Sequence, residues 1–316
     1  MKNKTKSLLV LSAAAIAGMY AYNRYVSNIA DELDSLNENE GEFYSWKEGN
    51  IFYRKIGSGK PLLLVHNIDS ASSSNEWQKV AKRLSTDHTV YILDLLGCGH
   101  SDKPAIQYTT YLYVQMITSF IKDIIKEKTD IVATNLSSPF VLMANKLDAT
   151  IIDKIILINP VSTSKMEMIP DSLSKFKMSI INTPIIGTFI YNRMYSPMKL
   201  NLRFDETYFM NGKQASTDLK DLFYASSHNN SGKGKYLFSS ILGNFMSQNM
   251  KHALKNFNKK VLIIASSDMK ENHNIIRQYE KNTNFSSIYV SGTKLYPHLE
   301  KPEKILKIIE NELNEK

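Results

Sequence analysis

The side chains that could carry chemistry in this 316-residue sequence are few and widely spaced. A single cysteine, Cys98, permits neither an intrachain disulfide nor a cysteine-based zinc site. No glycine-rich loop of the dinucleotide-binding or P-loop type occurs. The sequence therefore predicts no cofactor and no metal site. No metal-ligand spacing links the histidines that lie away from other motifs, which are His88, His100, His228, His252 and His273.

Strands alternating with helices must position any reactive residues. Continuous apolar runs at residues 61–65 and 89–93 are typical of buried parallel strands. Further strands are expected at residues 43–46, 51–55, 130–134, 154–158, 261–265 and 287–290. Helices are expected at residues 77–84, 117–125, 141–146 and 305–313. This order predicts an α/β fold, with a mostly parallel central sheet and helices on both faces.

Residues 161–257 interrupt the alternation. They are rich in Met, Tyr, Phe and Lys, show helical spacing of apolar residues and contain no clear strand. We expect a helical cap here, inserted between a first core segment at residues 42–160 and a second at residues 258–316.

The first 24 residues resemble a membrane segment. Lys2, Lys4 and Lys6 precede an uncharged stretch at residues 7–23, which as a helix would reach roughly 25 Å. It is either a transmembrane anchor or a cleaved signal peptide; large side chains where small ones are needed for cleavage favour the anchor. If the segment is an anchor, its basic end predicts a cytoplasmic N-terminus and a C-terminal domain outside the cell membrane. If the segment is cleaved, the rest of the chain is expected to be secreted. Residues 25–41 are interpreted as a linker.

Composition excludes several classes of protein. With 43% hydrophobic and 22% charged residues the chain can bury a core, so disorder is excluded. The net charge of +8 suits an anionic membrane or wall polymer as well as nucleic acid. Nucleic-acid binding would need basic and aromatic residues interleaved on one surface, which the sequence does not show, so no nucleic-acid partner is expected. The oligomeric state is left open.

Three segments resemble the α/β-hydrolase family. LLLVHNIDSASSSNEW (residues 62–77) is similar to its strand ending in His-Gly, with a serine-rich loop and a tryptophan following. YILDLLGCGHSDKP (residues 91–104) resembles its Asp-x-x-Gly-x-Gly-x-Ser-Asp-Lys-Pro turn, and PHLEKPEKI (residues 297–305) the segment after its catalytic histidine. The insertion at 161–257 fits capped members such as esterases, epoxide hydrolases and dehalogenases. The resemblance implies a nucleophile on a sharp strand-to-helix turn, a histidine base and a carboxylate.

The resemblance places Asn135 at the nucleophile position. Ala133 and Ser137 occupy the two small positions of the turn. A neutral carboxamide has no ionisable proton and attacks poorly, whereas asparagine tolerates the positive φ of such a turn. Ser137 could act as nucleophile only if the turn shifted by two residues. The pattern therefore predicts a degenerate site.

The other family positions are only partly filled. Asp268 matches the carboxylate, although a loop aspartate is as often a solvated turn residue. The histidine position holds Leu295, which can neither accept nor relay a proton, and His298 matches a second, non-catalytic histidine. The backbone N–H groups of Ile68 and Leu136 could still form an oxyanion hole, because such donors need no particular side chain.

Three hypotheses follow. The first is a catalytically silent, membrane-anchored protein of this family that binds a small apolar ligand or a partner through the cap pocket. The second is an active ester or carboxylic-type hydrolase with a displaced set of Ser137, Asp268 and His298. The third is a basic surface protein that binds anionic wall polymer or lipid. We favour the first because Asn135 and Leu295 each remove a group that the family mechanism requires.

Overall fold

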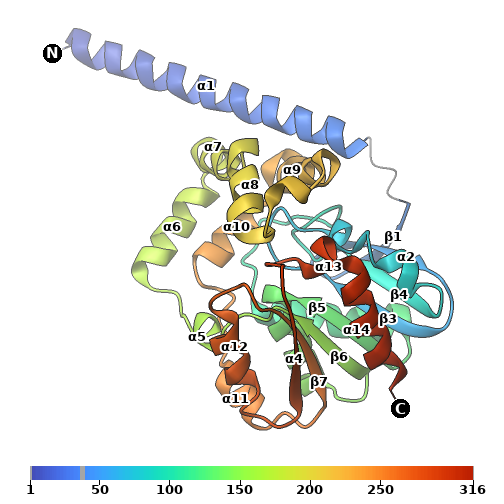
Figure 1. Ribbon diagram of the computed structural model, residues 1–316. Helices are drawn as coiled ribbons and strands as arrows, with labels where there is room; N and C mark the ends of the chain where they lie inside the picture. Colours follow the sequence, from blue (N-terminus) through green and yellow to red (C-terminus); the bar gives the residue numbers. More distant parts are fainter. Residues whose placement is uncertain (1, 36–39, 316) are drawn as a thin grey trace.

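An eight-stranded sheet forms the centre of the computed structural model, which describes residues 2–35 and 40–315 (Figure 1). Its strand order is β1-β2-β4-β3-β5-β6-β7-β8. The first two strands are antiparallel to their neighbours, and the other six are parallel. The strands are β1 (Glu42–Trp46), β2 (Gly49–Ile56), β3 (Lys60–Val65), β4 (His88–Leu93), β5 (Thr129–Thr134), β6 (Ile152–Ile158), β7 (Val261–Ser266) and β8 (Phe285–Val290). The predicted fold class is confirmed, and each expected strand lies within two residues of an observed one.

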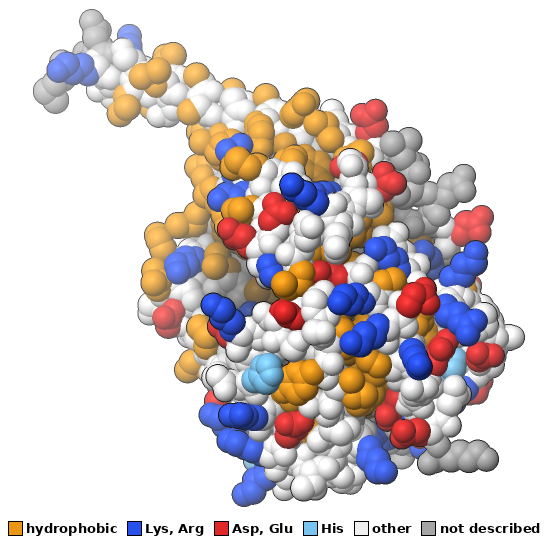
Figure 2. Space-filling model, in the orientation of Figure 1, with side chains coloured by type: hydrophobic (Ala, Val, Ile, Leu, Met, Phe, Trp, Pro, Cys, Tyr) orange, Lys and Arg blue, Asp and Glu red, His pale blue; other side chains and the backbone are white. Residues whose placement is uncertain are grey.

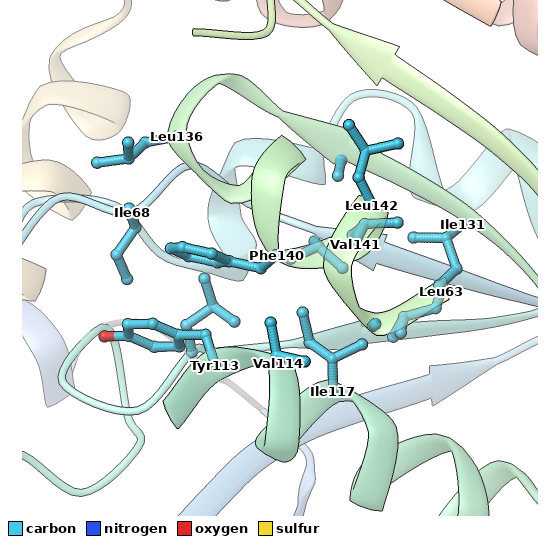
Figure 3. Close-up of a cluster of buried hydrophobic side chains, with 14 of the residues drawn as sticks. Leu63, Ile68, Tyr113, Val114, Ile117, Ile131, Leu136, Phe140, Val141 and Leu142 are labelled. Atoms are coloured by element: carbon cyan, nitrogen blue, oxygen red, sulfur yellow. The ribbon is translucent and has the colours of Figure 1, made fainter. Parts of the chain in front are cut away.

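Successive strand residues point to opposite faces of the sheet, so each face has its own apolar layer. One layer contains Leu63 and Ile131 together with Ile117 and Phe140 from two covering helices (Figure 3). The opposite layer contains Leu64 and Val132 among others. The first face is covered by α3 (Thr110–Phe120), the π-helical η2 (Ile121–Ile125), α4 (Ser138–Leu147) and α12 (Asn272–Tyr279), and the second by η1 (Ser74–Trp77), α2 (Ala81–Leu84) and α14 (Pro302–Asn314). The helix expected at residues 77–84 is therefore two short elements.

Residues 161–257, which we call the cap, fold as helices; the middle ones lie over the carboxyl ends of the strands, whereas the first and last lie beside the sheet (Figure 1). All residues of this segment are described, and none of them is in a strand. Its interior contains a cluster of buried aromatic side chains, among them Tyr195, Phe204 and Phe223. The elements are α5 (Thr163–Met166), α6 (Ser172–Asn182), α7 (Ile185–Met194), α8 (Pro197–Arg203), η4 (Phe204–Tyr208), η5 (Gly212–Gln214), α9 (Thr217–Gly232), α10 (Lys235–Leu242) and α11 (Met250–Lys255).

The N-terminal helix is longer than the sequence suggested. α1 (Lys2–Ser35) is continuous, so residues 25–35, which we predicted as part of a linker, are helical. Val26 and Ala30 are buried against the cap helices, and only residues 36–41 remain between α1 and β1, of which 36–39 lie outside the described residues. The amino-terminal half is exposed, and α1 is long and apolar enough to cross a membrane. The predicted linker is corrected because apolar residues at helical spacing attach this segment to the cap.

A buried histidine makes the cap sensitive to acid. His228 on α9 is 1% exposed, and burial lowers its pKa to about 4. The unfolded chain gains this proton near pH 6.5 and the folded chain only near pH 4, so stability falls as the pH drops through that interval. Between pH 7 and pH 4.5 we expect His228 to account for a loss of about 2 kcal/mol, and a His228→Gln variant should lack this contribution in urea unfolding at the two pH values. An identical pH dependence in both proteins would contradict this assignment.

Candidate active site

The turn between β5 and α4 carries Asn135 at its apex. Asn135 has a φ of 42°, in the left-handed region, and begins the short helix η3 (Asn135–Ser137). Its side-chain nitrogen donates to the backbone oxygen of Asn159 at 3.2 Å. Parallel pairing sets Val65 beside Ala133 and Thr134 beside Ile158, so three strand ends meet at this turn. A carboxamide thus occupies the place where the turn would present a nucleophile.

The hydroxyl of Ser137 faces away from that apex. Ser137 is fully buried, and its Oγ donates to the backbone oxygen of Thr134 at 2.7 Å. The backbone oxygen of Val65 lies 3.4 Å from the same Oγ. The hydroxyl of Ser137 therefore stabilises the turn by its contacts with the ends of β5 and β3.

The backbone N–H of Leu136 already has a partner inside the protein. It donates to the side-chain oxygen of Asn67 at 3.2 Å, and the Asn67 nitrogen donates to the hydroxyl of Tyr296 at 3.2 Å. An N–H group can only donate, so it fixes which end of the carboxamide faces the turn. The oxygen of Asn67 consequently takes the hydrogen bond that the Leu136 N–H could otherwise offer to a ligand. Our expectation of an open oxyanion hole was therefore wrong for the Leu136 donor, while the side chains of Leu136 and Ile68 belong to the apolar layer below (Figure 3).

Asn67 is held firmly in this position. Its backbone N–H donates to Oε2 of Glu76 at 3.0 Å. His66 accepts the Leu95 N–H at Nε2 (2.9 Å), which leaves Nδ1 to donate to the Asn67 backbone oxygen at 2.6 Å. With the side chain also bonded at both ends, Asn67 is 6% exposed. The Asn67 side chain that accepts from the Leu136 N–H is thus part of the folded core.

Leu295, at the expected base position, lies in the aromatic cluster beneath the cap. It is 7% exposed, its N–H faces the backbone oxygen of Thr207 at 3.4 Å, and its oxygen accepts from Asn159 at 3.1 Å. Asn159 also accepts from the Ser266 N–H at 2.8 Å and from the Asn272 side chain at 2.9 Å. Hydrogen bonds of the uncharged Asn159 side chain therefore hold the backbone at Leu295.

Asp268 lies on the protein surface. Its Oδ2 accepts from the Gly292 N–H at 2.7 Å, and this hydrogen bond lowers the pKa of the carboxyl group below its usual value. The side chain of Ser267 adds a second contact at 3.1 Å. Asp268 therefore ties the loop after β7 to the loop after β8, as a solvated turn residue does.

His298, by contrast, is completely buried in α13 (Pro297–Glu300). Its ring stacks on Trp77 with centroids 4.7 Å apart, and its Nε2 lies 3.3 Å from Oε1 of Glu76. The same carboxylate oxygen accepts from the hydroxyl of Thr134 at 2.5 Å. His298 and Glu76 thus form a buried pair behind the turn.

The displaced set of the second hypothesis is not assembled. Ser137 bonds to backbone oxygens, Asp268 faces solvent, and His298 pairs with Glu76. A working triad needs contacts of roughly 2.6–3.2 Å between consecutive members. That expectation is corrected, because each side chain is fixed by a different set of neighbours. Among residues 2–35 and 40–315, no group of three or more His, Cys, Asp or Glu side chains is placed to hold a metal.

Sequence reasoning missed Glu76 and Asn159, and for Asn67 it missed only the contact that the side chain makes with the turn. The signal for Asn67 was present, because it replaces the glycine of the His-Gly pair, and any side chain there must point somewhere near the turn. Glu76 could have been noticed as a charged residue beside the buried Trp77. Asn159, directly after β6, has no distinguishing pattern in a single sequence.

Comparison with known proteins agrees with the observed fold. A family model described as "alpha/beta hydrolase fold" matches residues 60–177. A solved epoxide hydrolase superposes with a TM-score of 0.69 at 15% identity, over 86% of this chain and 98% of that one. A carboxylesterase from Bacillus subtilis gives 0.67 at 13% identity, over 92% and 98%. The chain therefore has the α/β-hydrolase fold, and residues 60–177 match the model of that family.

Curated relatives of this chain match over a shorter region. An uncharacterized protein of Mycobacterium tuberculosis is 29% identical over 113 residues, which are 36% of this chain and 33% of that protein. A 2-hydroxy-6-oxo-6-(2'-aminophenyl)hexa-2,4-dienoic acid hydrolase of Metapseudomonas resinovorans is 28% identical over 107 residues, 33% of this chain and 37% of that enzyme. The chain thus matches only about a third of the length of these relatives.

Proposed function

We propose that this protein is a catalytically silent member of the α/β-hydrolase fold family, anchored in a membrane by α1. The observation that carries the proposal is the hydrogen bond from the Leu136 N–H to Oδ1 of Asn67, directly beside the carboxamide of Asn135. Acyl transfer needs a nucleophile, a base and free oxyanion donors together. Asn135 and Leu295 remove the first two, and Asn67 fills the third.

A binding role fits the surface that the cap shares with α1. A hollow of about 550 Å³ lies between α1, α8 and α9, within the size range of small-molecule sites. Its walls are mainly apolar, and they include Tyr22, Val26, Ile29, Leu33, Leu200 and Tyr224. We propose this groove as the place where a small apolar ligand or a partner is held.

A fluorophosphonate probe tests catalytic silence. We expect no covalent labelling of the wild-type chain under conditions in which an active serine hydrolase is labelled completely, and a Ser137→Ala variant should behave identically. The reason is that the hydroxyl of Ser137 is buried and already donates to the backbone oxygen of Thr134. Labelling of the wild type that disappears in Ser137→Ala would overturn the proposal in favour of the active-hydrolase alternative.

A further inference from the structure

A band of exposed apolar side chains covers one side of the cap. We call it the α6 face; on α6 it includes Leu173 and Phe176, which are 58% and 62% exposed, and on α7 Ile186, which is 47% exposed. Met168 and Ile169, just before α6, are 53% and 74% exposed. Figure 2 shows hydrophobic side chains along this edge of the cap, below the free half of α1. Such a concentration of exposed apolar groups marks an interaction surface.

The α6 face adjoins the point where α1 leaves the protein. Asn23 is the first strongly polar residue after the apolar stretch of α1, and its side chain donates to the backbone oxygen of Ile185 at 3.0 Å. Tyr22 packs edge-on against Phe189 at 5.3 Å. Ile185 begins α7, directly after the short turn that follows α6. If residues 7–22 cross a membrane, the end of α6 must therefore lie at the membrane surface.

The direction and composition of α6 suit a helix lying in that surface. Figure 1 shows α6 running away from α7 across the direction of α1, and so along the membrane rather than away from it. Leu173, Phe176 and Ile180 recur at helical spacing on one side, and Lys175 and Lys177 lie on the same helix. Residues 168–203 contain five Lys or Arg and one acidic residue. Apolar residues with flanking lysines are typical of interfacial helices on anionic lipid.

From this geometry we infer that the α6 face lies in the headgroup region of the same bilayer that α1 spans. The inference rests on the proposed membrane anchorage and goes beyond it, because anchorage by α1 does not by itself require the side chains of α6 to enter the lipid. The occupant is an anionic lipid surface: the lysines attract the headgroups, and Leu173 and Phe176 enter the acyl boundary.

Site-directed fluorescence on the full chain tests this. Cys98 is buried, so a thiol-reactive environment-sensitive dye will label only an introduced cysteine. The dye is placed at Phe176→Cys, and the chain is inserted, one copy per nanodisc, into phosphatidylcholine with roughly a quarter phosphatidylglycerol. We expect a blue-shifted emission and about twofold quenching or more by lipids that carry a spin label near the headgroup.

Two further positions separate the possible failures. Phe43→Cys is a matched control, since Phe43 is 60% exposed but lies on β1 at the far edge of the sheet, and it should show no quenching. Leu11→Cys, in the middle of the apolar stretch, should be quenched by deeply placed spin labels. Quenching at 11 without quenching at 176 would overturn the inference and leave the anchor intact. No quenching at 11 would overturn both. A blue shift of the dye emission at residue 176 that occurs only in concentrated detergent solution would overturn the inference in favour of contact between copies of the chain.

Discussion

Replacing Glu76 with alanine is expected to lower the free energy of unfolding by about 3–5 kcal/mol. Glu76 is 1% exposed and accepts from the backbone of Asn67 and the hydroxyl of Thr134, while His298 lies beside it. Its loss would leave two buried donors, the Asn67 N–H and the Thr134 hydroxyl, without their acceptor and would remove the carboxylate beside the buried His298 ring. Because small domains are stable by only about 5–15 kcal/mol, the effect would be a large part of the total. Urea unfolding followed by far-UV circular dichroism measures it.

Two further variants separate this effect from a general loss of charge. Glu310→Ala removes a surface carboxylate that pairs with Arg83 at 3.1 Å, and it should change stability by no more than about 0.5 kcal/mol. Glu76→Gln keeps one acceptor oxygen and is expected to fall between the two. If Glu76→Ala costs no more than Glu310→Ala, the carboxylate does not organise the turn as we describe.

The sheet could be predicted because its strands are continuous apolar runs that only burial on both faces explains. The same patterns placed Asn135 after a strand and Leu295 after another, and the fold puts both near the cap. A local pattern sufficed wherever the structure depends on residues close in sequence. This includes the apex of the turn, where the positive φ suits asparagine.

The rest depended on contacts between distant segments. Residues 25–35 contain several acidic residues and were interpreted as a linker, yet Val26 and Ala30 pack on a cap more than 150 residues away in the chain. Likewise, the replacement of a glycine by Asn67 indicates a side chain near the turn, but not that this side chain accepts from the N–H of Leu136, 69 residues later. Tertiary packing decides such features, and a single sequence does not record it.

Restoring the missing groups should show that Asn67 closes the site. A chain carrying Asn135→Ser and Leu295→His supplies a hydroxyl and an imidazole, but the Leu136 N–H still faces the carboxamide oxygen. Adding Asn67→Gly frees that donor for the developing oxyanion. Because one such donor contributes about 10²–10³-fold to rate, we expect fluorophosphonate labelling of the triple variant to be faster than that of the double variant by about this factor.

The matched control for this experiment is Asn67→Asp in the same double-variant background. A carboxylate there still accepts from the Leu136 N–H and from the hydroxyl of Tyr296, so the position stays filled and labelling should remain at the rate of the double variant. Equal rates for the glycine and aspartate variants would mean that Asn67 is not what closes the site. A gain with glycine alone would instead mean that this member of the fold family lost its chemistry in three places, of which the least visible in the sequence is a side chain that binds where the substrate's charge would form.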